Sequence, residues 1–181
     1  MKKIWTIVMV VLLTGCATGG WQKSPAETYK DSAHKFSAIL PSEWMHATGK
    51  TFIMTKDGIL LDIILVERVR FTDKISHIKK QFTSAMLPDE LADVEIDNYN
   101  SSSDNQKFEV LDKHAVTCAG QDAYSLAFRY QTKNGLWKKG MQYGFIHGGV
   151  VYRIVYEAAE QHYYQENEDA FEKFMESFSL K

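Results

Sequence analysis

AYSLAFRYQTKNGLWKKGMQYGFIHGGVVYRIVY, residues 123–156, indicates the architecture of this chain more clearly than any other stretch. Three runs rich in aromatic and β-branched residues are separated by Lys133-Asn134-Gly135 and by His147-Gly148-Gly149. Such runs favour strands, and Asn-Gly and Gly-Gly pairs are typical of the tight turns that join antiparallel neighbours. The stretch therefore predicts a three-stranded antiparallel meander.

The first half of the chain predicts further strands. Residues 34–40 alternate in polarity up to Pro41, and residues 51–55 form a short apolar run. Asp57-Gly58 is a hairpin signal between that run and residues 59–69, which are almost continuously apolar. We expect a continuous apolar strand of this kind in the centre of a sheet, covered on both faces.

Helical patterns occur before and after the meander. Behind the N-cap candidate Thr72-Asp73, apolar residues recur at helical spacing; they are Ile75, Ile78, Phe82 and Met86. We expect this helix to end at Pro88, a short second helix to start near Asp89, and residues 97–105 to form a loop. A C-terminal helix is expected over about residues 161–178, with acidic residues in its first half. This order of elements predicts an α+β fold with helices packed on an antiparallel sheet.

The N-terminus has the layout of a bacterial secretory signal. Lys2 and Lys3 precede an apolar run of about ten residues, which is too short to cross a membrane as a helix. Leu13-Thr14-Gly15-Cys16 closes the run and resembles the lipobox of bacterial lipoproteins. That resemblance implies cleavage between Gly15 and Cys16, a diacylglycerol thioether on Cys16 and acylation of its freed amine, for example by palmitate. The alternative is an ordinary cleaved signal with an incidental cysteine, which prefers an A-x-A-like site.

These features divide the chain into three parts. Residues 1–15 are expected to be a lipoprotein signal peptide, residues 16–33 a lipid-anchored flexible tether, and residues 34–181 one globular domain. Loss of the two signal lysines changes the formal net charge from −2 to −4, which argues against nucleic acid as a partner. By resemblance to Gram-negative lipoproteins, Ala17 directly after the cysteine favours the outer membrane, facing the periplasm.

Two stretches near the ends of the folded part carry a resemblance to a known family. Phe36-Ser37-Ala38-Ile39-Leu40-Pro41-Ser42-Glu43-Trp44 and the strand and acidic helix that end in FEKFMESF, residues 171–178, are similar to the opening and ending of PsbP-like domains. Bacterial lipoproteins of the DcrB type belong to that group. Over residues 34–181 the resemblance implies an α/β/α sandwich with a central antiparallel sheet and a C-terminal helix. It implies no single function, because the group shares its architecture and not an active site.

The sequence assigns no catalytic residue and no cofactor, because it contains no nucleophile elbow, P-loop or zinc-ligand spacing. His162 and Glu166 are four residues apart and are candidate metal ligands, although acidic residues near a helix start ordinarily complement its dipole. We interpret His147-Gly148-Gly149 as a turn rather than an oxyanion loop. Cys118, the only cysteine left in the domain, is expected to be a small core residue, with a reactive thiol as the alternative.

The aromatic residues of the late strands are expected mostly in the core, with an exposed aromatic binding face as the alternative. Together these observations predict a non-enzymatic, membrane-anchored lipoprotein of the cell envelope. Its partners would be the bilayer, through acylated Cys16, and an envelope protein that it binds or stabilises. The first alternative is a carrier module for a small ligand or a metal, and the second is an enzyme, by default a hydrolase.

Overall fold

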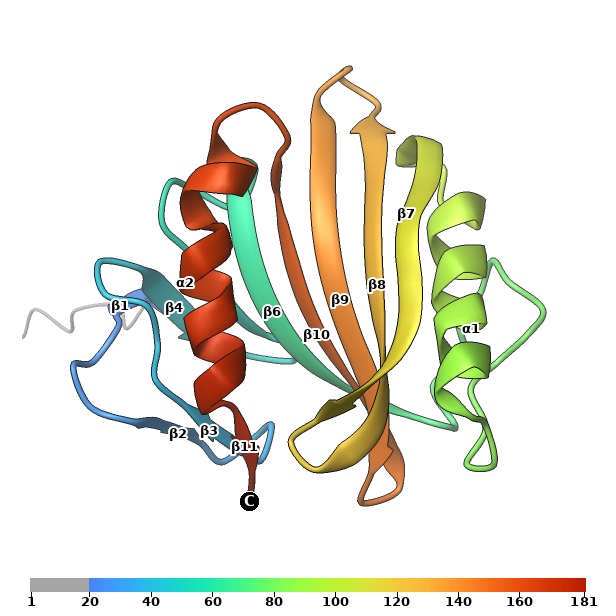
Figure 1. The fold of residues 1–181 in the computed structure, drawn as a ribbon, viewed down its shortest axis with the longest axis horizontal. Helices are drawn as coiled ribbons and strands as arrows, with labels where there is room; N and C mark the ends of the chain where they lie inside the picture. Colours follow the sequence, from blue (N-terminus) through green and yellow to red (C-terminus); the bar gives the residue numbers. More distant parts are fainter. Residues whose placement is uncertain (1–19) are drawn as a thin grey trace, which may run out of the picture.

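The computed structural model describes residues 20–181, and its largest unit is an eight-stranded antiparallel sheet (Figure 1). The strands follow the order β1 (Gln22–Lys23), β4 (Met45–Thr48), β5 (Phe52–Thr55), β6 (Asp62–Arg70), β10 (Val150–Ala159), β9 (Trp137–His147), β8 (Gln121–Thr132) and β7 (Asn105–Cys118). A second antiparallel sheet contains β11 (Ser179–Leu180), β3 (Phe36–Ala38) and β2 (Tyr29–Asp31). The helices are α1 (Pro88–Ser101) and α2 (Tyr163–Ser177).

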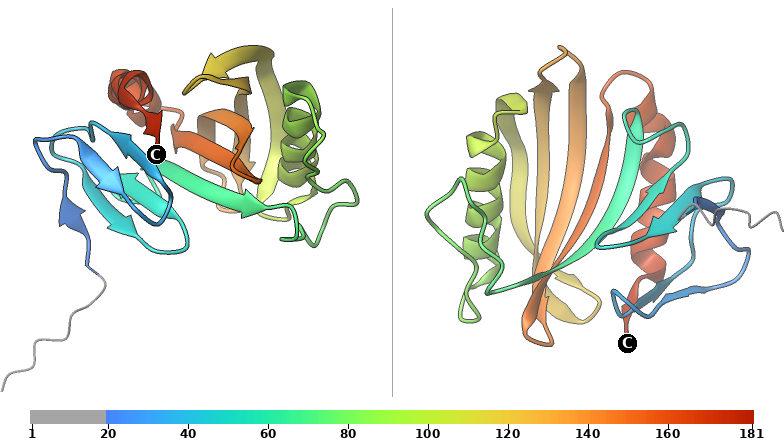
Figure 2. Two further views of the ribbon diagram at one scale, coloured as in Figure 1. Left: turned by 90° about the horizontal axis from the view of Figure 1, so that it is seen from below. Right: turned by 180° about the vertical axis from the view of Figure 1, so that it is seen from behind.

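Strand β10 divides the interior into two clusters, because its successive side chains point to opposite faces of the sheet. Val151 and Val155 pack with residues of α1, whereas Tyr152 and Ile154 pack in the cluster that contains the apolar side of α2. Helix α1 lies against β7, β8 and β9, and α2 lies against β10, β9, β6 and β3. The two helices therefore cover opposite faces of the large sheet, as the views in Figure 2 show.

The predicted α/β/α sandwich is only partly confirmed, because the described residues are mostly sheet and each face carries one helix. The small sheet shares the α2 face of the large sheet. Phe36 and Ala38 of β3 pack in the same cluster as Phe52 of β5 and Phe174 of α2. The chain returns from α2 into β11, where Ser179 pairs with Ser37, so the C-terminus completes the small sheet.

The predicted meander is confirmed. Strand β8 pairs with β9, and β9 pairs with β10, all antiparallel. Gly148 and Gly149 have φ values of 58° and 77° in the turn before β10, a conformation that glycine adopts without steric cost. The residues of β6 are less covered than expected: alternate side chains are only half-buried, because α1 lies over β7 to β9 instead.

The prediction of a helix after Thr72 was wrong, and so was the loop expected at residues 97–105. Residues 71–87 form turns and irregular loop, whereas the second helix expected near Asp89 is confirmed as α1, which begins at Pro88 and is longer than expected because it continues to Ser101. The side chain of Gln81 bonds the backbone N–H of Ile75 and the carbonyls of Ile75 and Ile78, so it satisfies backbone groups that a helix would otherwise pair. The apolar residues of the segment still pack in the α1 cluster, which explains their spacing.

Part of the segment expected to be a flexible tether contributes strands. Gln22 and Lys23 pair with His46 and Met45, and Asp31 at the end of β2 is buried. Strands of two or three residues are too short to show an alternating pattern, so composition alone misjudged the segment. Strand structure thus begins twelve residues before residue 34, at Gln22.

A partly buried ion cluster joins α1 to the sheet. Arg153 of β10 lies 2.8 Å from Glu95 of α1 and 2.8 Å from Glu67 of β6. Burial alone would lower the pKa of Arg153, but the two carboxylates outweigh burial and raise it, so the guanidinium stays charged. Beside it, Tyr99 of α1 donates to the carboxylate of Glu157 over 3.2 Å. The cluster fixes how α1 sits on the strands.

The first prediction concerns the packing of aromatic rings over strand glycines. Gly144 is the cross-strand partner of Tyr124, and a Cβ at position 144 would overlap that ring. We expect Gly144→Ala to lower the free energy of unfolding by about 1–3 kcal/mol, the usual cost of overpacking. Gly49→Ala is the control, because its Cβ would meet nothing closer than 4.0 Å. Urea unfolding measures both, and equal stabilities would contradict the packing argument.

The second prediction concerns the ion cluster. Arg153→Met leaves the fully buried carboxylate of Glu95 without its cation, which should cost about 3–5 kcal/mol of unfolding free energy. Glu95→Met in the same chain should recover most of that loss, because no unpaired charge then remains between α1 and β10. Chemical denaturation of the two single variants and the double variant measures the coupling. Additive losses would show that the two side chains do not interact.

Candidate functional site

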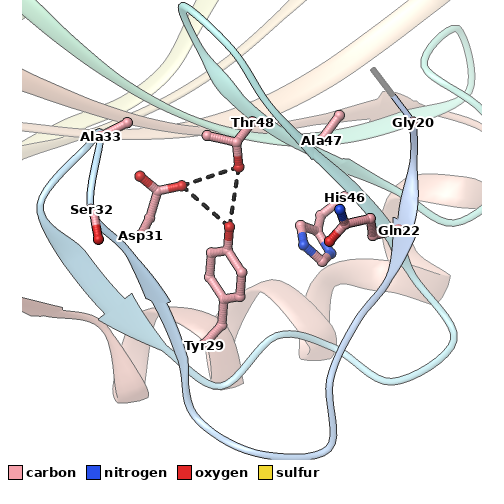
Figure 3. Close-up of a pocket in the computed structure, with 9 residues that line it drawn as sticks. All are labelled: Gly20, Gln22, Tyr29, Asp31, Ser32, Ala33, His46, Ala47 and Thr48. Carbon is pink, nitrogen blue, oxygen red and sulfur yellow. Dashed lines mark hydrogen bonds between the residues drawn. The ribbon is translucent and has the colours of Figure 1, made fainter. Parts of the chain in front are cut away.

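The candidate site is a cavity of about 490 Å³ between β1, β2 and β4 (Figure 3). The lining side chains that carry chemistry are Tyr29, Asp31, His46, Thr48 and Gln22. The pairing of β1 with β4 places Gln22 opposite His46 in the large sheet. Strand β2, which carries Tyr29 and Asp31, lies at the edge of the small sheet. The cavity therefore lies where the edges of the two sheets meet.

Three oxygen-bearing side chains converge in the cavity (Figure 3). The Thr48 hydroxyl donates to Asp31 Oδ2 over 3.2 Å, and the Tyr29 hydroxyl lies 3.1 Å from Thr48 Oγ1 and 3.4 Å from Asp31 Oδ2. Burial and the Asp31 charge raise the pKa of Tyr29, so the phenol stays protonated. The triangle therefore lines the cavity with the Tyr29 and Thr48 hydroxyl groups, which surround the buried carboxylate of Asp31.

Asp31 is held in place by His34. The backbone N–H of His34 donates to Asp31 Oδ1 over 2.7 Å, and His34 Nδ1 lies 3.1 Å from the same oxygen. Burial alone would raise the pKa of Asp31, but these bonds, the His34 charge and Thr48 outweigh it and lower the pKa. His34 Nε2 faces the carbonyl of Lys50 at 3.1 Å, so both ring nitrogens have partners.

His46 differs from His34 because one of its ring nitrogens has no partner. The residue is only 4% exposed, and Nδ1 is buried without a hydrogen bond. Its ring packs against Tyr29, with centroids 4.8 Å apart, and against Phe52. Burial lowers the pKa of His46 more than the nearby Asp31 charge raises it, so the neutral ring is favoured. An unpaired buried nitrogen is a free hydrogen-bonding group beside the cavity.

The arrangement suits recognition of a small polar molecule better than catalysis by these groups. The Asp31–His34 pair resembles half of a catalytic triad, but the second nitrogen of His34 is occupied by a carbonyl and does not reach a nucleophile. The cavity is lined by His46 and by the hydroxyl-bearing side chains of Tyr29, Ser32 and Thr48, while His46 Nδ1 and the Asp31 carboxylate lie buried in its wall. These groups can orient a ligand through hydrogen bonds.

The structure brings His162 and Glu166 together, but as a two-residue contact and not as part of a larger ligand set. His162 Nε2 lies 3.0 Å from Glu166 Oε2, and Lys56 Nζ lies 2.9 Å from Glu166 Oε1. The ammonium group of Lys56 occupies the place where a cation would bind. Within residues 20–181, no group of three or more His, Cys, Asp or Glu side chains has a metal-binding arrangement.

The other described residues that the sequence analysis singled out lie in the core or in a turn. Cys118 is buried with a free thiol, and burial raises its pKa to about 11, so the reactive thiolate is disfavoured at neutral pH. Phe145, Tyr152 and Tyr156 are at most 1% exposed, so the late-strand aromatics form the core rather than an open binding face. His147-Gly148-Gly149 is the turn between β9 and β10, as expected.

Gly15 and Cys16, the predicted cleavage and lipidation site, lie outside the described residues. Across residues 20–181, none of the helices combines the length and apolar character that membrane crossing requires. The candidate cavity begins close to that end of the chain, because Gly20 and Gln22 line it. The anchor proposed from sequence would therefore lie only a few residues from the cavity.

Sequence reasoning missed every residue of the cavity. Tyr29 and Asp31 belong to the segment interpreted as a tether, and His46 and Thr48 belong to a strand of four residues that no periodic pattern marks. The one available signal was Asp31, three residues before His34, a spacing that allows the carboxylate to cap the following turn.

With the fold and cavity described, comparison with known proteins identifies the class. The PsbP family profile matches residues 24–180, and the chain belongs to that family. The match begins at residue 24, directly after β1, and includes β2, which agrees with the ordered structure there. No match was found among curated proteins.

Several solved structures share the fold. They include cyanobacterial PsbP (CyanoP) from Synechocystis sp. PCC 6803, with a TM-score of 0.56, 14% identity and coverage of 92% of this chain and 96% of that one. LpqN, involved in cell envelope biogenesis of Mycobacterium tuberculosis, has a TM-score of 0.55, 14% identity and coverage of 81% and 83%. PA94 from Pseudomonas aeruginosa, a putative regulator by its description, has a TM-score of 0.52, 14% identity and coverage of 81% and 91%. At this identity the likeness shows the fold alone.

The third prediction tests His46. The neutral ring is favoured in the folded state, whereas the unfolded ring takes up a proton near its ordinary value of about 6.5. The unfolded chain therefore binds more protons as the pH falls below that value, and stability falls until the pH passes below the folded pKa. His46→Phe keeps the ring packing and should remove this part of the pH dependence.

Thermal unfolding between pH 5 and 8 measures the effect. His77→Gln is the control, because His77 is exposed and should leave the pH profile of the wild type unchanged. A His46→Phe profile that runs parallel to the wild type would contradict a depressed pKa at this position.

Proposed function

We propose that this PsbP-family chain is a lipid-anchored cell-envelope protein that acts by binding a protein partner. The observation that carries the proposal is Leu13-Thr14-Gly15-Cys16, which follows two lysines and a short apolar run. Acyl chains on Cys16 would supply the bilayer attachment, since two or more chains anchor a protein stably. The involvement of LpqN in cell envelope biogenesis is consistent with a role in the same compartment.

The position of the anchor is consistent with a Gram-negative outer membrane. Ala17 follows the cysteine, and by resemblance to lipoproteins of that group such a residue directs the protein to the outer membrane, facing the periplasm. There the domain would bind or stabilise an envelope protein. Binding rather than catalysis is favoured by the two groups best suited to chemistry: His34 has both ring nitrogens engaged, and the pKa of the Cys118 thiol is raised.

One specific observation favours a second function, the carriage of a small polar ligand. His46, whose buried Nδ1 has no hydrogen-bond partner, lines a cavity of about 490 Å³ together with the hydroxyl-bearing side chains of Tyr29, Ser32 and Thr48. Native mass spectrometry of the purified protein tests this directly. A bound mass that disappears in His46→Phe would support a carrier, whereas an unliganded mass for wild type in native extracts would contradict it.

The fourth prediction tests the anchor. Cys16→Ser should abolish incorporation of labelled palmitate, because serine offers no thioether, and should leave the signal peptide uncleaved. Cys118→Ser is the matched control: it removes the other cysteine and should keep both the label and the mature size. Labelling in a bacterial host followed by gel electrophoresis measures both, and palmitate retained by Cys16→Ser would overturn the anchor.

The partner is tested separately from the anchor. Chemical crosslinking in intact cells, followed by purification of the acylated protein in mild detergent, should recover a defined envelope protein. Recovery of the acylated chain alone, with no crosslinked species, would count against partner binding while leaving the anchor standing.

A further inference from the structure

One part of the large sheet carries apolar side chains that no helix covers. Alternate residues of β4, β5 and β6 face the α1 side of the sheet, but α1 lies over β7, β8 and β9. Ala47, Ile53 and Leu65 are neighbours in register across the three strands and are only half-buried. In the right-hand view of Figure 2, α2 lies behind β6 and no helix lies in front of these strands.

Three exposed large apolar residues lie at the rim of this face, and they are Trp21, Ile59 and Leu60. Trp21, Met45 and Ile59 line a shallow hollow of about 390 Å³. Trp21 is 42% exposed, Ile59 is 50% exposed, and the adjoining Leu60 is 75% exposed. Large apolar side chains gathered in this way are uncommon on a monomer surface and mark a contact site.

The loop that carries Ile59 and Leu60 is held rigidly. The fully buried carboxylate of Asp62 accepts hydrogen bonds from the Thr55 hydroxyl at 2.6 Å and from the backbone N–H groups of Lys56 and Asp57 at 2.9 and 3.2 Å. Asn167 of α2 donates to the other carboxylate oxygen over 3.1 Å. The loop therefore cannot fold its apolar side chains inward, and their exposure is fixed by the core.

The start of the described chain identifies what covers this surface. Gly20 follows Cys16 by four residue steps, and an extended chain spans at most about 3.6 Å per step, so an acylated Cys16 lies at most about 14 Å from Gly20. Trp21 is the next residue. We propose that Trp21, Ile59 and Leu60 dock on the bilayer that holds the acyl chains, an inference that rests on the proposed lipid anchor.

The chemistry of the rim fits a lipid headgroup region. Tryptophan is enriched at membrane–water interfaces, where its amphipathic ring is favoured. Lys23 is exposed and lies two residues after Trp21, so both face the same side of β1 and its ammonium group can approach lipid phosphates. Docking through this rim gives the domain one orientation on the membrane instead of free rotation about its tether.

The fifth prediction uses the acylated full-length protein in vesicles of phosphatidylcholine and phosphatidylglycerol whose acyl chains are brominated near the headgroup. After signal cleavage the tryptophans are Trp21, Trp44 and Trp137, and Trp44 is only 2% exposed. We expect bromine to quench the fluorescence, and we expect Trp21→Phe to lose that quenching. Quenching that persists in Trp21→Phe would place a different face on the bilayer and overturn the proposal.

The double variant Ile59→Asp/Leu60→Asp should lose the quenching of Trp21 as well. The matched control is Val110→Asp/Leu111→Asp, an exposed apolar pair on β7 at the opposite edge of the sheet, which should keep it. Palmitate labelling and vesicle flotation report the anchor independently. If the wild-type protein incorporates palmitate and floats with the vesicles but Trp21 is not quenched, the anchor is intact and the docking proposal is refuted. An unquenched chain that dimerises in detergent through Ile59 would assign the surface to a second copy instead.

Discussion

The structure depends on the burial of both faces of β10. Antiparallel pairing with β6 and β9 fixes its register, and the alternation of its side chains then sends Val151 and Val155 to one helix and Tyr152 and Ile154 to the other. A shift of one residue would exchange the two sets and place a tyrosine against the packed helix α1. Arg153 reinforces the register, because only one alignment brings its guanidinium to both Glu95 and Glu67.

The sequence predicts the parts of this fold that have a clear local signal. The meander from β8 to β10 is recognisable because apolar runs alternate with Asn-Gly and Gly-Gly turns, and α2 because one side of it is apolar. The start of α1 was predicted within one residue, whereas the helix expected after Thr72 is absent because apolar residues at helical spacing there do not form a helix. Ile75 and Phe82 pack in the α1 cluster from a segment of turns, where the Gln81 side chain replaces helical hydrogen bonds. Tertiary packing therefore determines the conformation of residues 71–87, and the spacing of apolar residues in the sequence does not reveal it.

The candidate cavity was beyond sequence reasoning for a different reason. Its groups come from strands of two to four residues in two sheets, and only the fold brings Tyr29 within 3.1 Å of Thr48. Nothing in the sequence distinguishes His46, whose Nδ1 is unpaired, from His34, whose ring nitrogens both face oxygen atoms. The resemblance to PsbP-like domains predicted the family, the antiparallel sheet and the C-terminal helix, but it could not supply a site that the group does not share.

Strand β1 links the two surfaces that carry the functional argument. Gln22 lines the cavity and lies opposite His46, whereas Trp21 lines the apolar hollow with Met45, on the other side of the same strand pair. The strand is held to the sheet by two residue pairs and by one further bond, from the Ser24 N–H to the Trp44 carbonyl at 2.9 Å. An anchor at Cys16 would transmit any force on the protein through this short pairing. Contact of Trp21 with lipid would stabilise β1 on the side of the hollow, and a ligand bound at His46 would stabilise it on the side of the cavity. An edge strand with so little pairing of its own is therefore the place where membrane contact and cavity occupancy would influence each other.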